Sequence, residues 1–375
     1  MRGRFLVFIG FLAIACGGSG EDKEDFGQVS LSLDTVKVDA KGEILMAGAS
    51  IFLSDLSPDK DYLYNFDTKN SLLEIINLDA LALEEKIKIS TEGPNGVGTM
   101  VNRVSLAKDG AVAFYNSLRL DILNLEGEKI FGFGYRNHGF EEDFISPNQY
   151  LSNQLVFLDQ GNEVVGVLYS SKTMDFQSLV RIDFDKKKIE KIDIPELSIV
   201  NDFVINFNPG NRSMYFIQPI YMVKVDRKIL ISNAARGMVQ SYDIDDRTVL
   251  SKKVDSKIFT DGIQGEYKKH IESQEEINDE TWRMDQEIQF SPLIWDPQSK
   301  RFYRFSHQKI LRAENGNPSK FKVYLTVMDQ ELNVVDAVEV PSFSKKTNDH
   351  FVKDGKIWIY ENMEDELGFL RLSIN

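Results

Sequence analysis

The chain has 375 residues, of which 58 are acidic and 44 are basic, so its formal net charge is −14. An acidic surface of this kind repels nucleic acid, and we expect no nucleic-acid partner. Only one cysteine is present, which excludes a disulfide within the chain and leaves the fold to depend on its apolar core.

The first fifteen residues have the layout of an export signal. Arg2 and Arg4 precede an apolar run over 5–14, and small residues follow. A helix of that length covers roughly 15 Å, about half the hydrocarbon core of a bilayer, so it is too short to span a membrane. We therefore predict that residues 1–15 are a cleaved signal peptide.

Cys16 indicates which kind of signal this is. Ala13 and Ala15 also satisfy the small-x-small pattern of an ordinary secretory signal. The single cysteine nevertheless stands directly after the predicted cleavage point, and an exported protein has reason to avoid an unpaired thiol without a use. We predict lipid attachment at Cys16, although Ala13 stands where a lipobox usually has leucine.

Residues 16–28 are predicted to form the lipidated cysteine and a flexible tether. The sequence after Cys16 is rich in glycine and then in acidic residues, as in a solvated linker. It is either an ordinary tail or a sorting signal for the outer face of the outer membrane. We expect a lipid-anchored protein of the outer membrane that faces the periplasm or the cell surface.

Residues 29–375 are predicted to be one all-β domain. Short apolar runs rich in Ile, Val, Phe and Tyr alternate with turn residues, and no long helical period dominates. A polar–apolar–acidic or amide motif ends one strand in each repeat. Four copies and two looser ones occur, at Asn77-Leu78-Asp79, Asn124-Leu125-Glu126, Asp183-Phe184-Asp185, Asp243-Ile244-Asp245, Val327-Met328-Asp329 and Ser373-Ile374-Asn375.

A second predicted strand lies upstream of each copy of the motif. These strands cover residues 62–66, 112–116, 164–168, 229–233, 301–305 and 357–360. The closest copies of the motif are about 46 residues apart, which is the length of one four-stranded propeller blade. Six copies predict a six-bladed β-propeller.

The sixth repeat ends at Asn375 without the further strand that the others have, such as 128–134. Residues 29–39 form an alternating strand with no repeat of their own. We expect this N-terminal strand to pair with the last blade and close the ring. The alternative is a sandwich or an open array that starts with the same strand.

One acidic insertion near 265–289 is poor in β-branched residues and is predicted to contain a helix. Such a helix either caps one face of the domain or docks a partner.

The glycine-rich residues 92–98 predict a tight turn between two blades, with a ligand-contacting loop as the alternative. The aromatic and basic residues 290–305 predict strands with arginines stacked on rings, or else a sugar-stacking platform.

The sequence contains no spacing that predicts catalysis or metal binding. His138, His270, His307 and His350 are far apart, so we assign no metal ligands, no catalytic residues and no cofactor. The motifs of serine hydrolases, P-loops and dinucleotide-binding folds are missing from the sequence.

Several of these strings resemble a Bacteroidota family of lipoproteins of unassigned role, the domain of unknown function 4221. The resemblance rests on residues 92–98, on Leu63-Tyr64 with residues 73–79, and on Trp295-Asp296 with residues 302–304. It covers most of the mature chain and implies a lipid-anchored, propeller-like domain. No activity follows from it.

Two functions are expected from these features. The leading hypothesis is a non-enzymatic envelope lipoprotein whose propeller binds a protein partner or a glycan. The alternative is an extracellular hydrolase or lyase with its site at the mouth of the propeller channel, which would need acidic or histidine side chains from several blades.

Overall fold

The computed structural model describes residues 29–45, 50–116, 118–135, 145–146, 148–158, 163–210, 212–313, 318–347, 349–364 and 366–375. The predicted signal peptide, Cys16 and the tether lie outside these residues, as does His138. Within the described part of the chain, no helix is long and apolar enough to span a membrane.

The described residues form six antiparallel sheets of four strands each, which we number along the chain. Sheet 1 consists of β2 (Ser54–Leu56), β3 (Tyr62–Asp67), β4 (Leu72–Asn77) and β5 (Ala82–Lys88). Sheet 2 consists of β6 (Arg103–Leu106), β7 (Val112–Tyr115), β8 (Arg119–Leu123) and β9 (Lys129–Gly134). Sheet 3 consists of β10 (Gln149–Phe157), β11 (Glu163–Ser170), β12 (Phe176–Asp183) and β13 (Lys188–Ile192). Sheet 4 consists of β16 (Ile220–Val225), β17 (Lys228–Asn233), β18 (Met238–Asp243) and β19 (Val249–Lys253). Sheet 5 consists of β21 (Gln289–Asp296), β22 (Arg301–Leu311), β23 (Lys320–Met328) and β24 (Val334–Glu339). Sheet 6 consists of β25 (His350–Lys353), β26 (Lys356–Met363), β27 (Glu366–Ile374) and β1 (Leu31–Lys37).

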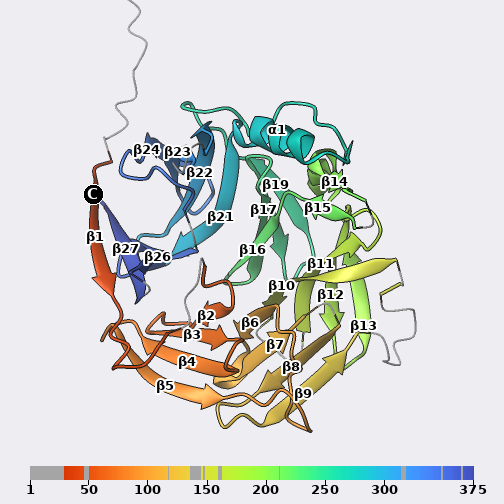
Figure 1. Ribbon diagram of the computed structural model, residues 1–375, viewed down its shortest axis with the longest axis vertical. Coiled ribbons are helices and arrows are strands. Elements are labelled where there is room, and N and C mark those ends of the chain that lie inside the picture. Colours follow the sequence, from red (N-terminus) through yellow and green to blue (C-terminus); the bar gives the residue numbers. More distant parts are fainter. Residues whose placement is uncertain are drawn as a thin grey trace, which may run out of the picture.

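The sheets are arranged as the blades of a β-propeller (Figure 1). The first strand of each sheet lines one central cavity. Neighbouring first strands are in contact, as in the pairs β2 and β6, β10 and β16, β16 and β21, and β21 and β25. The all-β propeller fold predicted from the repeat is therefore confirmed.

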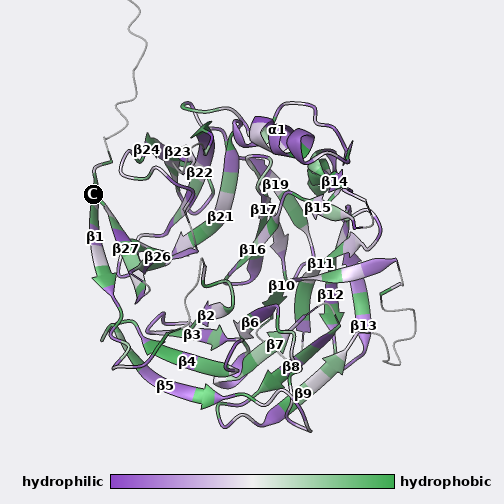
Figure 2. Ribbon diagram, viewed as in Figure 1, coloured by the Kyte–Doolittle hydropathy of each residue, from purple (hydrophilic) through white to green (hydrophobic). Residues whose placement is uncertain are grey.

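The apolar core is divided among the junctions between sheets. Each junction has its own cluster of buried side chains, and one of the six clusters joins sheet 6 to sheet 1 through residues such as Trp358, Phe369, Leu63 and Ile76. Most sheets must therefore be apolar on both faces, which gives their central strands nearly continuous hydrophobic sequences (Figure 2).

The repeated three-residue motif ends the third strand of each sheet, and its polar side chain shapes the following turn. Asn77 Oδ1 accepts the N–H of Ala80 at 2.8 Å, and Asp183 Oδ1 accepts that of Lys186 at 2.9 Å. Short side-chain oxygens that bond the backbone a few residues later are typical of such turns. This bonding explains why Asn or Asp recurs at the motif.

The N-terminal strand pairs with the last sheet, as predicted. β1 runs antiparallel to β27 from Leu31 opposite Ile374 to Lys37 opposite Gly368. The Asp34 carboxylate of β1 lies 2.6 Å from Arg371 Nε and 3.0 Å from Lys356 Nζ, so ion pairs add to the backbone pairing.

A buried lysine also joins sheet 6 to sheet 1. The side chain of Lys353 is 4% exposed, and its Nζ lies 2.7 Å from Asp79 and 3.0 Å from Asp61. An ammonium group this buried requires such partners, because desolvation of an unpaired charge is costly. The turns of sheet 1 therefore position the hairpin formed by β25 and β26.

Two insertions before and after sheet 4 form a separate small unit. It contains the 3-10 segment η2 (Pro195–Phe203), the strands β14 (Ile205–Phe207), β15 (Met214–Phe216) and β20 (His270–Ile271), and the helix α1 (Gln274–Asp285). The helix predicted near 265–289 is confirmed, and Ser273 caps it by accepting the N–H of Glu276. The strands and the 3-10 segment of the first insertion, 195–216, were not predicted from the sequence.

We predict that β1 is required for a stable domain. A chain that begins at residue 40 loses the pairing with β27 and leaves the edge of that strand exposed. Its melting temperature should fall by about 5 °C or more relative to a chain that begins at residue 29. Calorimetry and size-exclusion chromatography measure this; equal melting temperatures and an unchanged monomer would contradict the prediction.

Candidate functional site

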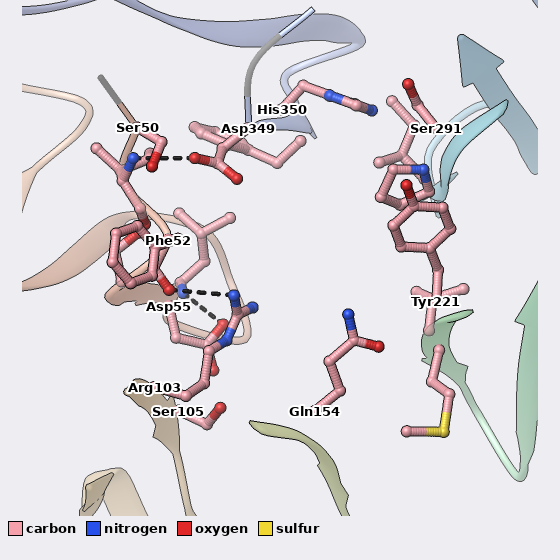
Figure 3. Close-up of a pocket in the computed structure, with 18 of the residues that line it drawn as sticks. Ser50, Phe52, Asp55, Arg103, Ser105, Gln154, Tyr221, Ser291, Asp349 and His350 are labelled. Carbon is pink, nitrogen blue, oxygen red and sulfur yellow. Dashed lines mark hydrogen bonds between the residues drawn. The ribbon is translucent and has the colours of Figure 1, made fainter. Parts of the chain in front are cut away.

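The candidate site is the central cavity, with a volume of about 580 Å³. Its walls come from the first strands of all six sheets and from the residues just before them. Figure 3 shows that Arg103, Gln154, Tyr221 and His350 surround its open centre. A cavity of this size holds a ligand of a few hundred daltons.

Two carboxylates in the wall bond the backbone of the neighbouring sheet. Asp55 of sheet 1 accepts the N–H of Leu106 in sheet 2 at 2.8 Å and that of Leu56 at 2.9 Å. Asp349, just before β25, accepts the N–H of Ile51 at 2.9 Å. These carboxylates therefore hold sheets 6, 1 and 2 together around the cavity.

A guanidinium group of sheet 2 makes a similar connection to the backbone that precedes sheet 1. Arg103 Nη1 of sheet 2 donates to the carbonyl oxygen of Phe52, which precedes β2, at 3.1 Å (Figure 3). The Phe52 ring is 52% exposed. An aromatic ring and a guanidinium group thus lie together beside the cavity.

The position of these groups within the fold changes their pKa values. Burial raises the pKa of the Asp55 carboxyl above its ordinary value, and the bonded N–H groups and the charge of Arg103 oppose this shift. Burial raises the pKa of Tyr221 to about 12, so its phenol is a neutral donor at neutral pH. Desolvation by the surrounding protein lowers the pKa of the Lys346 ammonium group, although the residue as a whole is exposed.

A buried arginine in β22 bonds the backbone of the wall strand β21. Arg304 is 2% exposed and donates to the carbonyl oxygens of Ser291 at 3.1 Å and Asn233 at 2.9 Å. Its guanidinium lies 4.3 Å from the centroid of the Phe290 ring, and burial lowers its pKa to about 9. The packing of arginine on rings predicted for residues 290–305 is confirmed.

Residues 92–98 form the predicted turn between sheets 1 and 2. Gly93 and Gly98 have φ angles of +78° and +85°, which favour glycine. Lys129 Nζ donates to the Gly96 carbonyl oxygen at 2.5 Å. The turn is not part of the cavity wall, so the ligand-loop alternative is not supported at this site.

The three histidines among the described residues lie in different parts of the fold. His350 lies in the cavity wall, His270 belongs to β20, and His307 is buried in β22, where burial lowers its pKa to about 3. Within the described ranges, no group of three or more His, Cys, Asp or Glu side chains is placed to hold a metal ion.

The comparisons identify a family. Residues 27–336 match the family model described as "Domain of unknown function (DUF4221)". The chain belongs to the DUF4221 family. The resemblance recognised in the sequence is therefore confirmed, but DUF4221 carries no established activity.

Solved structures resemble this DUF4221 chain in fold. A family member from Bacteroides vulgatus is 15% identical, with a TM-score of 0.66 over 92% of this chain and 98% of that one. A putative exported protein from Bacteroides fragilis is 12% identical, with a TM-score of 0.51 over 92% and 95% of the two chains. At these identities the likeness shows the fold alone. No curated protein matches the sequence.

The sequence did not reveal the cavity residues of this DUF4221 chain. Asp55, Arg103 and Tyr221 lie on first strands that are three to six residues long and show no clear alternation. One signal was available: the sequence predicted the second strand of each repeat, and the first strand must lie just before it. Polar residues at those positions would have been the candidates.

We predict that the Asp55 carboxylate stabilises the domain. In Asp55→Asn only one side-chain oxygen remains, so one of the two bonded N–H groups loses its acceptor. The free energy of unfolding should fall by about 1–3 kcal/mol. Urea unfolding measures it, with the exposed Asp109→Asn as the control; equal losses in both variants would contradict the prediction.

Proposed function

We propose that this chain is a non-enzymatic, lipid-anchored envelope protein whose central cavity binds a mono- or disaccharide. The observation that carries the proposal is the cavity itself, which collects side chains from six sheets at one place. Of the protein and glycan ligands considered from the sequence, the glycan fits a concave site of about 580 Å³ better.

The chemistry of the wall supports a sugar ligand. Gln154 supplies an amide, Tyr221 a phenol, and Ser105 and Ser291 hydroxyls, all of which bond sugar hydroxyl groups. Phe52 offers a half-exposed ring on which the apolar face of a sugar ring packs. A second hollow of about 420 Å³ shares Phe52, Arg103 and Gln154 with the cavity and extends the site.

The proposed location rests on the N-terminal sequence. Arg2 and Arg4, the apolar run over 5–14 and the single Cys16 support export and lipid attachment, and residues 17–28 support a tether to the domain. The related Bacteroides fragilis protein is described as a putative exported protein. We propose the outer membrane, with the domain facing the periplasm or the cell surface.

One observation favours a second candidate function, an extracellular hydrolase or lyase. Asp55 and Asp349 line the same cavity, and acid–base cleavage of glycosidic bonds uses two carboxyl groups. We place this function second because both carboxylates accept backbone N–H groups and so have a structural role.

We predict that the domain binds sugars through Gln154. A panel of mono- and disaccharides tested by calorimetry against the chain from residue 29 should contain a ligand. Its affinity should fall roughly five- to tenfold in Gln154→Ala, the loss of about one hydrogen bond. Gln177→Ala, on exposed β12 surface, is the control. Release of reducing ends from bound sugar would instead support the hydrolase.

We predict that Cys16 is the site of lipid attachment. Cells expressing the full chain should incorporate labelled palmitate into the protein, which should enter the detergent phase on phase separation. Cys16→Ala should lose the label and move to the aqueous phase, whereas Ser19→Ala should behave like the parent. Label retained in Cys16→Ala would refute lipidation at this residue.

A further inference from the structure

We propose that the sugar bound in the central cavity carries a carboxylate, as a uronic acid does, and that Arg103 binds that carboxylate while Lys346, in the same wall, adds positive charge to the cavity. This inference rests on the proposed function and names the class of sugar. It follows from which charges in the cavity wall are already used and which are not.

The acidic groups of the wall are already occupied. Asp55 uses both oxygens to accept backbone N–H groups, and Asp349 accepts the N–H of Ile51. Their bonds join neighbouring sheets, so a ligand that competed for them would loosen the wall. These carboxylates are therefore poor sites for a cationic ligand.

The cationic groups of the wall, in contrast, have no ion-pair partner among the described residues. Among the ion pairs of the described residues, none includes Arg103 or Lys346, whereas cations such as Lys353 and Arg181 have a carboxylate partner. The charge of Arg103 acts on Asp55, and that of Lys346 on Asp285, only from beyond ion-pair distance. Arg103 uses one nitrogen to bond the Phe52 carbonyl, which leaves the rest of its planar fork available. A carboxylate matches that fork.

A hydroxyl next to Lys346 also lacks a partner. Thr347 lines the cavity, and its Oγ1 is buried with no hydrogen-bond partner among the described residues. A buried hydroxyl without a partner costs free energy that a ligand can recover. The ammonium of Lys346 likewise sits where desolvation disfavours its charge, and a bound anion would restore it.

A monoanion fits the site better than a phosphate. The two carboxylates in the wall repel any anion, and the repulsion grows with the charge of the ligand. A phosphate monoester, with nearly two charges at neutral pH, doubles both this repulsion and the attraction to the cations, but its desolvation cost rises about fourfold, because that cost grows with the square of the charge. A uronic acid also keeps the ring hydroxyls that Gln154, Tyr221 and Ser291 are placed to bond.

The test compares sugars that differ only in the acidic group. Calorimetry on the chain from residue 29 would measure glucose against glucuronate, galactose against galacturonate, and the matching sugar 6-phosphates. At least one uronate should bind ten times or more tightly than its neutral partner and more tightly than the phosphate. Arg103→Gln should remove this preference, while Arg227→Gln, an exposed arginine paired with Asp245, should keep it.

The outcomes separate this inference from the proposed function. Equal affinity for uronate and neutral sugar would overturn the acidic ligand and leave sugar binding intact. Tighter binding of the phosphate would overturn the carboxylate. If no sugar binds at all, the proposed function fails as well. Should Arg103→Gln not fold, Lys346→Met provides the second variant, and a preference unchanged in it would count against the inference.

Discussion

The cavity depends on side chains that bond the backbone of the adjacent sheet. The first strands of sheets 1, 2 and 6 are short, so few of their backbone groups are paired within their own sheet; β2 has three residues, and β6 and β25 have four each. Asp55, Asp349 and Arg103 supply the missing partners across the junctions between sheets 6, 1 and 2. Buried backbone groups need such partners, and the polar wall of the cavity follows from that need.

The same side chains determine what the cavity offers to a ligand. Because the carboxylates are committed to the backbone, the groups left for a ligand are mostly hydrogen-bond donors: the free part of the Arg103 fork, Lys346, Gln154 and Tyr221. The site therefore offers cations and hydrogen-bond donors to a ligand, whereas the whole chain has a net charge of −14. Net charge describes the surface that partners meet at long range, whereas the wall governs recognition at contact.

The sequence predicted those parts of the fold that depend on local chemistry. Asn77 and Asp183 bond the backbone three residues later, so each repeat carries a recognisable turn. The last repeat lacked a strand, and β1 was the unmatched segment. The cavity could not be predicted in this way, because Asp349 and Ile51 are 298 positions apart and only the fold brings them together. The strands β14 and β20 were missed for the same reason, since their pairing joins two separate insertions.

The pairing of β1 with β27 also constrains the order in which the chain can fold. β1, the first described strand, has as its partner β27, the last one described, and Ser30 and Asn375 bond each other at 3.0 Å. Sheets 1 to 5 need only segments near them in sequence, so each can form soon after its own residues become available. Contacts between the two ends of a chain form slowly because a long loop must close first. Until then β1 is an unpaired strand, and a chaperone that covers strand edges would act at this stage.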